Sequence, residues 1–247
     1  MILKTFRKSL VIVFLLWFCF GNALVKAQSC SYSVTLHPTH VLCNGDATGS
    51  ISVTQSPSDT YTYLWSTGET TNTINNLKAQ TYFVKVTNSK GCEVVEFATI
   101  TEPPKLVVQT QLSHPVCHGE NSGSIVVTAT GGVSPYLYTW TNSCDSSNNK
   151  DLYSDQYTNT VTDANFCKVV TVSSLVQPDA ISTSAVVIDA RGYGLSDGSI
   201  DILTTGGVHP YIYLWKDSLA YEQTTEDIYN IPSRTYKLSI TDARNCK

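Results

Sequence analysis

The chain has 247 residues, with 16 basic and 20 acidic side chains and a formal net charge of −4. Lysine and arginine form no cluster after Ala27, which argues against a nucleic-acid-binding surface. Apolar residues make up 42% of the chain and alternate with polar ones, so it should fold and not remain disordered. Its wealth of Thr, Val and Tyr, without helical heptads, favours β-strands throughout.

Residues 1–27 have the pattern of a secretory signal peptide. A basic start from Lys4 to Lys8 precedes the apolar run Leu10–Phe20, and Val25–Ala27 predicts cleavage before Gln28. The run is shorter than the roughly 20 apolar residues needed to cross a bilayer. We therefore expect a mature chain that is not embedded in a membrane, with an uncleaved anchor as the alternative. Without its four basic residues, the mature chain has 12 basic (16 − 4) against 20 acidic side chains.

Three blocks of sequence recur at a nearly constant period along the chain. Equivalent blocks open 74 residues apart (117 − 43) and then 75 apart (192 − 117) at Cys43, Cys117 and Gly192. Such a period suits a small independent domain. We expect three tandem copies, which we name repeat 1 (28–104), repeat 2 (105–179) and repeat 3 (180–247). The blocks are Cys43–Ile51, Cys117–Ile125 and Gly192–Ile200; Tyr61–Trp65, Tyr136–Trp140 and Tyr211–Trp215; Tyr82–Cys92, Tyr157–Cys167 and Tyr236–Cys246.

Short alternating runs between Gly, Asn, Asp and Pro signals predict that each repeat is a small antiparallel, immunoglobulin-like β-sandwich. Prolines at the boundaries, Pro103–Pro104 and Pro178, should make the string of domains semi-rigid. Only Lys247 follows Cys246, so repeat 3 should lack its last strand and be the least stable, as in a truncated protein or the opening part of a longer one. In repeat 1 the expected strands are Val34–Leu36, Gly49–Thr54, Tyr61–Trp65, Thr73–Leu77, Tyr82–Thr87 and Cys92–Ile100.

Turn residues carry further expectations. The pairs Gly131-Gly132 and Gly206-Gly207 should adopt positive φ. In the hairpin that ends at the second cysteine, Phe166 is a poor left-handed residue and Asn245 a good one. Asp163 and Asp242 occur at equivalent turns, and capping of the turn backbone is favoured over calcium binding or catalysis.

Seven cysteines remain after the signal peptide, and an exported chain favours disulfides. Because they occupy equivalent places, we expect the pairs Cys43–Cys92 and Cys117–Cys167, each within one repeat. Repeat 3 has Gly192 at the first position. The partners of Cys30, Cys144 and Cys246 stay open, and an odd number leaves at least one thiol free or bonded to another chain.

The aromatic strand of each repeat is the best binding candidate. Its aromatic side chains share one face. We favour this face as the core, with Trp packed near the disulfide, because it alone is apolar in all three repeats. The alternative is an exposed strip that stacks on glycans. The possible glycan contacts are Tyr61, Tyr63, Tyr136, Tyr138, Tyr211 and Tyr213.

No arrangement of residues predicts catalysis or a cofactor. The motifs of serine hydrolases, zinc proteases and phosphate loops are missing from the sequence. His37, His40 and Cys43 have a spacing that does not converge on a metal along a strand or loop. Neighbouring Cys117 and His118 would point apart in a strand, which disfavours a nucleophile pair. We expect neither an enzyme nor a metal site.

The pattern of Cys117, Gly119, Gly123–Ile125, Gly131-Gly132, Pro135-Tyr136, Trp140, Tyr157, Thr162-Asp163 and Cys167 resembles the SprB repeat, found in cell-surface gliding adhesins of Bacteroidetes. The resemblance covers about residues 30–247. Repeat 1 departs from it with Ser56-Pro57 in place of the double glycine, and repeat 3 lacks the first cysteine. It implies an extracellular or outer-surface adhesive array, with gliding motility as one use and a glycan, surface polymer or other surface protein as partner. The alternative is a carbohydrate-binding or spacer module of a secreted hydrolase.

Overall fold

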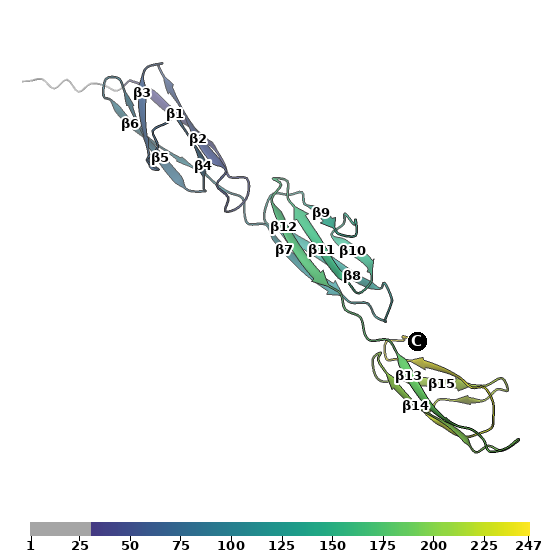
Figure 1. Cartoon of the computed structure of the whole chain (residues 1–247). Coiled ribbons are helices and arrows are strands. Elements are labelled where there is room, and N and C mark those ends of the chain that lie inside the picture. Colours follow the sequence, from purple (N-terminus) through teal and green to yellow (C-terminus); the bar gives the residue numbers. More distant parts are fainter. Residues whose placement is uncertain (1–30) are drawn as a thin grey trace, which may run out of the picture.

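The computed structural model describes residues 31–247, so the expected signal peptide and Cys30 lie outside the described residues. All regular elements in this range are strands, and Figure 1 shows them as three sandwiches following one another along a line. No helix in the described range is long and apolar enough to cross a membrane.

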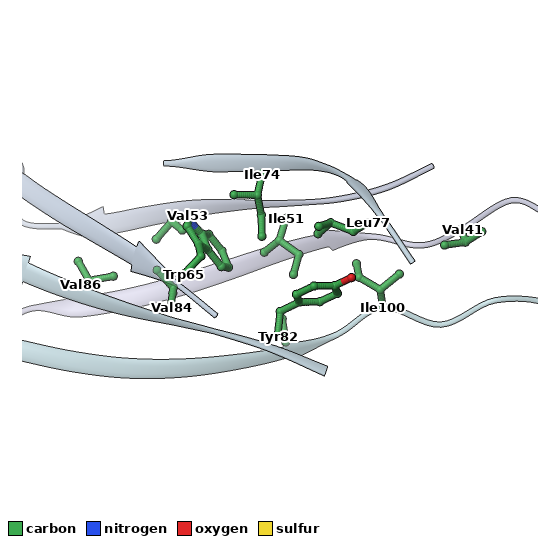
Figure 2. Close-up of a cluster of buried hydrophobic side chains, with 11 residues drawn as sticks. Val41, Ile51, Val53, Trp65, Ile74, Leu77, Tyr82, Val84, Val86 and Ile100 are labelled. Carbon is green, nitrogen blue, oxygen red and sulfur yellow. The ribbon is translucent and has the colours of Figure 1, made fainter. Parts of the chain in front are cut away.

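Repeat 1 folds into two antiparallel three-stranded sheets, ordered β1-β2-β4 and β3-β5-β6. Alternation along β2 places Ile51 and Val53 inside the sandwich, and Trp65 from β3 covers them from the opposite sheet (Figure 2). The strands of repeat 1 are β1 (Ser33–Thr39), β2 (Gly49–Ser56), β3 (Tyr61–Trp65), β4 (Thr73–Leu77), β5 (Thr81–Asn88) and β6 (Glu93–Thr99).

Repeat 2 has the same topology, with sheets β7-β8-β10 and β9-β11-β12. Its core gathers around Trp140, Ile125 and Val161. The expected class of tandem immunoglobulin-like sandwiches is thus confirmed. The strands are β7 (Val107–Ser113), β8 (Gly123–Thr130), β9 (Leu137–Trp140), β10 (Asn148–Leu152), β11 (Gln156–Thr162) and β12 (Lys168–Ser174).

Repeat 3 forms sheets β13-β14-β17 and β16-β15-β18. Within the described range nothing takes the place that β6 and β12 hold in the other repeats, so β18 pairs with β15 alone. The short β16 instead extends the other edge of β15. The missing last strand was expected, but the added β16 was not. The strands are β13 (Ser182–Ile188), β14 (Gly198–Thr205), β15 (Ile212–Lys216), β16 (Glu222–Gln223), β17 (Ile228–Ile231) and β18 (Lys237–Thr241).

The turn predictions are confirmed. Both glycines of each pair have positive φ, 70° and 59° at Gly131-Gly132 and 76° and 57° at Gly206-Gly207. Phe166 is left-handed with φ of 65°, and its side chain is 82% exposed. Asn245 has nearly the same φ, 67°, with a side chain that tolerates it. Repeat 2 therefore holds an unfavourable residue in a turn where repeat 3 holds a favourable one.

Candidate functional site at the junctions between repeats

The disulfides join neighbouring repeats, which corrects the predicted pairing. Cys43 of repeat 1 is bonded to Cys167 of repeat 2, and Cys117 of repeat 2 to Cys246 of repeat 3. Cys246, whose partner the sequence left open, thus pairs with the first cysteine of the preceding repeat. Cys92 is also disulfide-bonded, with a cysteine other than these four. Cys144 is a half-buried free thiol.

The predicted pairs fail because a strand separates the two cysteines of each repeat. The loop of Cys43 lies beside Thr101 and Glu102, where the chain leaves repeat 1. Cys92 lies in the hairpin at the opposite end of β6, whose seven residues span about 23 Å at roughly 3.3 Å per residue. Disulfides require Cα atoms within about 7 Å, and the observed bridges have Cα–Cα distances of 5.6 and 5.5 Å. The second cysteine therefore reaches only the neighbouring repeat.

Junction 1–2 is the contact region between repeats 1 and 2, and its first part fixes the cysteine loop to the linker. The backbone N–H of Gly45 donates to Oε2 of Glu102 at 2.6 Å, and the side-chain amide of Asn44 donates to the carbonyl of Pro103 at 3.1 Å. From repeat 2, the side-chain amide of Asn165 donates to the carbonyl of Leu42 at 2.9 Å. The loop that carries Cys43 is thus held by its own linker and by the next repeat.

The second part of junction 1–2 is the double-glycine loop of repeat 2. The N–H of Gly132 donates to the carbonyl of Pro104 at 2.7 Å. A Cβ at Gly131 would lie 2.0 Å from the carbonyl oxygen of Lys105, so only glycine lets the linker approach this closely. The double glycine therefore serves the junction as well as the turn.

Asp163 connects the double-glycine loop to the hairpin that carries Cys167. Its Oδ1 accepts the N–H groups of Asn165 and Cys167 at 2.8 and 2.9 Å, and its Oδ2 accepts that of Val133 at 2.9 Å. The carboxylate is buried. The capping role favoured from the sequence is thus observed, and it extends beyond the turn because one oxygen reaches the neighbouring loop.

Junction 2–3, between repeats 2 and 3, repeats this arrangement. The N–H of Gly119 donates to Oε1 of Gln177 at 2.8 Å, and that of Gly207 donates to the carbonyl of Asp179 at 2.9 Å. Asp242 accepts the N–H groups of Arg244, Cys246 and Val208 at 2.8 to 2.9 Å. The two junctions are thus built from equivalent residues.

The pKa of Asp242 reflects this network. Burial of the carboxyl group opposes its ionisation, but the backbone N–H groups of Cys246, Val208 and Arg244 together outweigh burial and hold the pKa below its ordinary value. The nearby Arg244 cation acts in the same direction. The carboxylate form is therefore the one that joins the hairpin of Cys246 to the double-glycine loop.

The tyrosines predicted as possible glycan contacts face inward. Each Trp of the aromatic strands is buried, at 2–4% exposure, and the tyrosines are buried or half-buried against the same cores. Their hydroxyls are also engaged: Tyr61 donates to Pro57, Tyr136 to Gly131 and Tyr211 to Gly206. The face is the core, as favoured, and it does not provide the exposed strip that sugar stacking needs. The cysteines Cys43, Cys117 and Cys167, which were expected to form disulfides within repeats, form their bridges at the junctions instead.

Two histidines accept backbone hydrogen bonds, and a third contacts a side chain. His40 and His114, at equivalent places, accept the N–H groups of Thr101 and Val176 at 3.1 and 3.2 Å. His37 contacts Thr54 at 2.9 Å, and Cys43 is consumed by its bridge. Residues 31–247 contain no group of three side chains arranged to hold a metal ion.

Sequence reasoning missed Glu102, Gln177 and Asn165, which have no motif of their own. The positions of the cysteines in the sequence could have predicted the observed pairing. Pairing within repeats leaves Cys246 without a partner, whereas pairing the first cysteine of each repeat with the second cysteine of the next accounts for both Cys246 and Gly192.

Comparison with solved structures finds immunoglobulin-domain chains of low identity. A chain from the complex of Dpr2 Ig1-Ig2 with DIP-Theta Ig1-Ig3 is 12% identical, with 76% of this chain and 80% of that chain covered and a TM-score of 0.28. An eight-domain segment of Down Syndrome Cell Adhesion Molecule is 11% identical, with 78% and 36% covered and a TM-score of 0.36. A titin segment is 14% identical, with 85% and 91% covered and a TM-score of 0.23.

No curated protein matches the chain. The family model described as SprB repeat matches it three times, at residues 35–70, 110–143 and 189–220. Each match falls in one of the three copies and includes its glycine-rich loop and aromatic strand. The SprB repeat model therefore matches each of the three tandem copies, as the sequence pattern predicted.

Proposed function

We propose that the chain works outside the cell as a stiff, non-catalytic adhesive array of three domains, divided at residues 104 and 179. The junctions carry this proposal. Each combines a disulfide with hydrogen bonds from the linker to both repeats, so neighbouring domains keep a fixed orientation. Disulfides form in oxidising compartments, which supports export through the predicted signal peptide.

A stiff array suits weak adhesion to a repetitive surface. Linked sites gain effective concentration only when their spacing matches the spacing of the ligand, and fixed junctions keep that spacing constant. Three weak contacts to a surface polymer, glycan or other surface protein then hold more strongly than one. A role in gliding would use the same property, because adhesion must persist while the surface moves.

A carbohydrate-binding module of a secreted hydrolase is the second candidate, and one observation favours it. Phe83 and Phe97 face each other across β5 and β6 on the outer side of repeat 1, with ring centroids 5.9 Å apart. They are 42% and 66% exposed. An exposed ring pair offers an apolar platform that the inward-facing tyrosines do not. If one repeat alone binds glycan, this pair is where it stacks.

Two binding measurements separate the candidates. Beads densely coated with the mature chain should adhere to insoluble polysaccharides such as cellulose and chitin, while the soluble chain gives no saturable binding to the matching oligosaccharides by calorimetry. Saturable binding by the soluble chain that is lost in Phe83→Ala/Phe97→Ala would favour the module instead. The matched control is Val170→Ala/Val172→Ala, on the outer face of repeat 2. Beads that adhere to no polymer and no cell surface would refute adhesion.

A further inference from the structure

The two bridges are interleaved along the chain, since their cysteines follow in the order Cys43, Cys117, Cys167 and Cys246. Each bridge joins two points that are distant in the chain, and we call each joined pair a node. One node is Cys43 with Cys167, and the other is Cys117 with Cys246. Three branches of chain then connect the same two nodes side by side: Cys43 to Cys117, Cys117 to Cys167, and Cys167 to Cys246. In chain positions their lengths are 117 − 43 = 74, 167 − 117 = 50 and 246 − 167 = 79. The branch within repeat 2 is therefore the shortest.

We propose that this covalent arrangement makes the array an extension-limited tether that carries tension between the surfaces it joins. Chains in parallel cannot be stretched beyond the shortest of them, here the branch within repeat 2. Without bridges the stretch from Cys43 to Cys246 covers 246 − 43 = 203 positions. At about 3.4 Å per extended residue, the limits are roughly 170 Å with the bridges and roughly 690 Å without them.

With the two bridges alone, tension between the two nodes follows the shortest branch. A pull on the chain before Ser33 passes through β1 to Cys43 and crosses to Cys167, and it leaves repeat 2 at Cys117 and crosses to Cys246. The strands of repeat 1 after Cys43 lie on one longer branch together with β7, and repeat 3 up to Cys246 lies on the other together with β12. Both longer branches are still slack when the shortest is fully extended. The further bridge of Cys92 in the natural chain joins the first of them to another part of the chain.

The shortest branch runs through the folded core of repeat 2. It contains β8, β9, β10 and β11, whereas β7 precedes Cys117 and β12 follows Cys167 on the two longer branches. Seven paired residues join β8 to β7, and seven join β11 to β12, which holds the shortest branch in the folded repeat.

The extension limit concerns mechanics alone, whereas the surfaces that the tether joins rest on the proposed function. Single-molecule stretching between terminal tags tests it on a mature chain in which Cys30, Cys92 and Cys144 are serine and only the two bridges remain. Any further bridge in the natural chain adds a path and can only lower the limit. The measured quantity is the fully stretched length before and after a thiol reductant is added, and the tags cancel in the difference.

On reduction the oxidised chain should gain the length of 203 − 50 = 153 positions, about 520 Å at roughly 3.4 Å per residue. In Cys117→Ser/Cys246→Ser the stretch between positions 43 and 246 should be as long as the branch from Cys167 to position 246. In Cys43→Ser/Cys167→Ser it should be as long as the branch from position 43 to Cys117. These lengths follow from covalent links alone, so partial folding of a variant does not blur them. An oxidised chain that stretches as far as the reduced one, or by a length that matches pairing within repeats, would overturn the proposal.

Discussion

Repeats 2 and 3 share the topology of the first sheet but differ in the second sheet. Repeat 2 has six strands, with β11 hydrogen-bonded on both sides, and it is bridged to a neighbour at each end. In repeat 3 the equivalent β18 pairs on one side only, and every residue of β13 is exposed. Val186, Val187 and Ile188 are each more than half exposed. The comparison shows that in repeat 2 the last strand covers the second side of β11, whereas within the described residues β18 has no strand on that side.

The largest difference should come from removing a bridge. Cys117→Ser/Cys246→Ser frees repeat 3, and the chain-entropy model gives about 5 kcal/mol for a closed loop of this length. Repeat 3 should then unfold well below the others in thermal denaturation followed by hydrogen exchange. The matched variant Cys43→Ser/Cys167→Ser should leave repeat 2 folded, because its sheets are complete. Equal sensitivity of the two repeats would break the comparison.

Gly131→Ala should weaken junction 1–2 by more than the turn alone explains. A left-handed alanine costs about 1–2 kcal/mol, and here the added Cβ also collides with the backbone of Lys105. Gly119→Ala is the control, since Gly119 has a similar φ of 74° and open space around the added methyl group. Urea denaturation compares the two. A cost no greater than that of the control would mean that the linker moves away freely.

Asp163→Asn should cost about 1–3 kcal/mol in the stability of repeat 2. Asparagine can still accept the N–H groups of Asn165 and Cys167, as Asn88 does for Lys90 and Cys92 in repeat 1. It would, however, present an NH₂ group to the N–H of Val133. Asn88→Asp, where no such third contact exists, is the reverse control and should change stability little. Denaturant midpoints of the two variants decide the point.

Acid should loosen junction 2–3 through Asp242. Its folded pKa lies below the ordinary value, so its contribution to stability is fully present above the unfolded pKa of about 4 and disappears as the pH falls through the folded pKa. Hydrogen exchange at the Cys246 amide should accelerate in this window beyond the intrinsic pH effect. Asp242→Asn should abolish this additional acceleration of exchange. If the additional acceleration were unchanged in that variant, another titrating group would be its cause.

The smallest expected effect is an increase in stability. Phe166→Asn places in repeat 2 the residue that repeat 3 has at the same turn, and it should stabilise by about 1 kcal/mol, because asparagine tolerates left-handed backbone better. Little packing is lost, as the ring is 82% exposed. Asn245→Phe should produce the opposite change in repeat 3. Thermal midpoints measure both, and a loss in the first would show that the ring contributes to the junction.

Much of the fold could be predicted because its signals are local. The nearly constant period marked three domains, the alternation in Gly49–Ser56 placed a strand, and the glycine pairs and Asp163 predicted their turns. The cysteine pairing could not be obtained this way. Cys43, Cys92, Cys117 and Cys167 look equivalent along the chain, and their partners depend on which ends of two domains meet. The role of the tyrosines was equally ambiguous. Their alternation along the strand shows that they share one face of the sheet, but it does not show whether that face is buried or exposed.

By itself, then, the sequence determined the number of repeats, their sandwich class and the turn at each hairpin, since these depend on residues close together in the chain. Only the tertiary structure decided that β6 and β12 hold the two cysteines of a repeat at opposite ends, so that the bridges link neighbours. The reason is geometric: a disulfide spans a few ångströms, whereas a seven-residue strand spans about 23 Å. Because of that length, the two disulfides expected within domains are found between neighbouring domains.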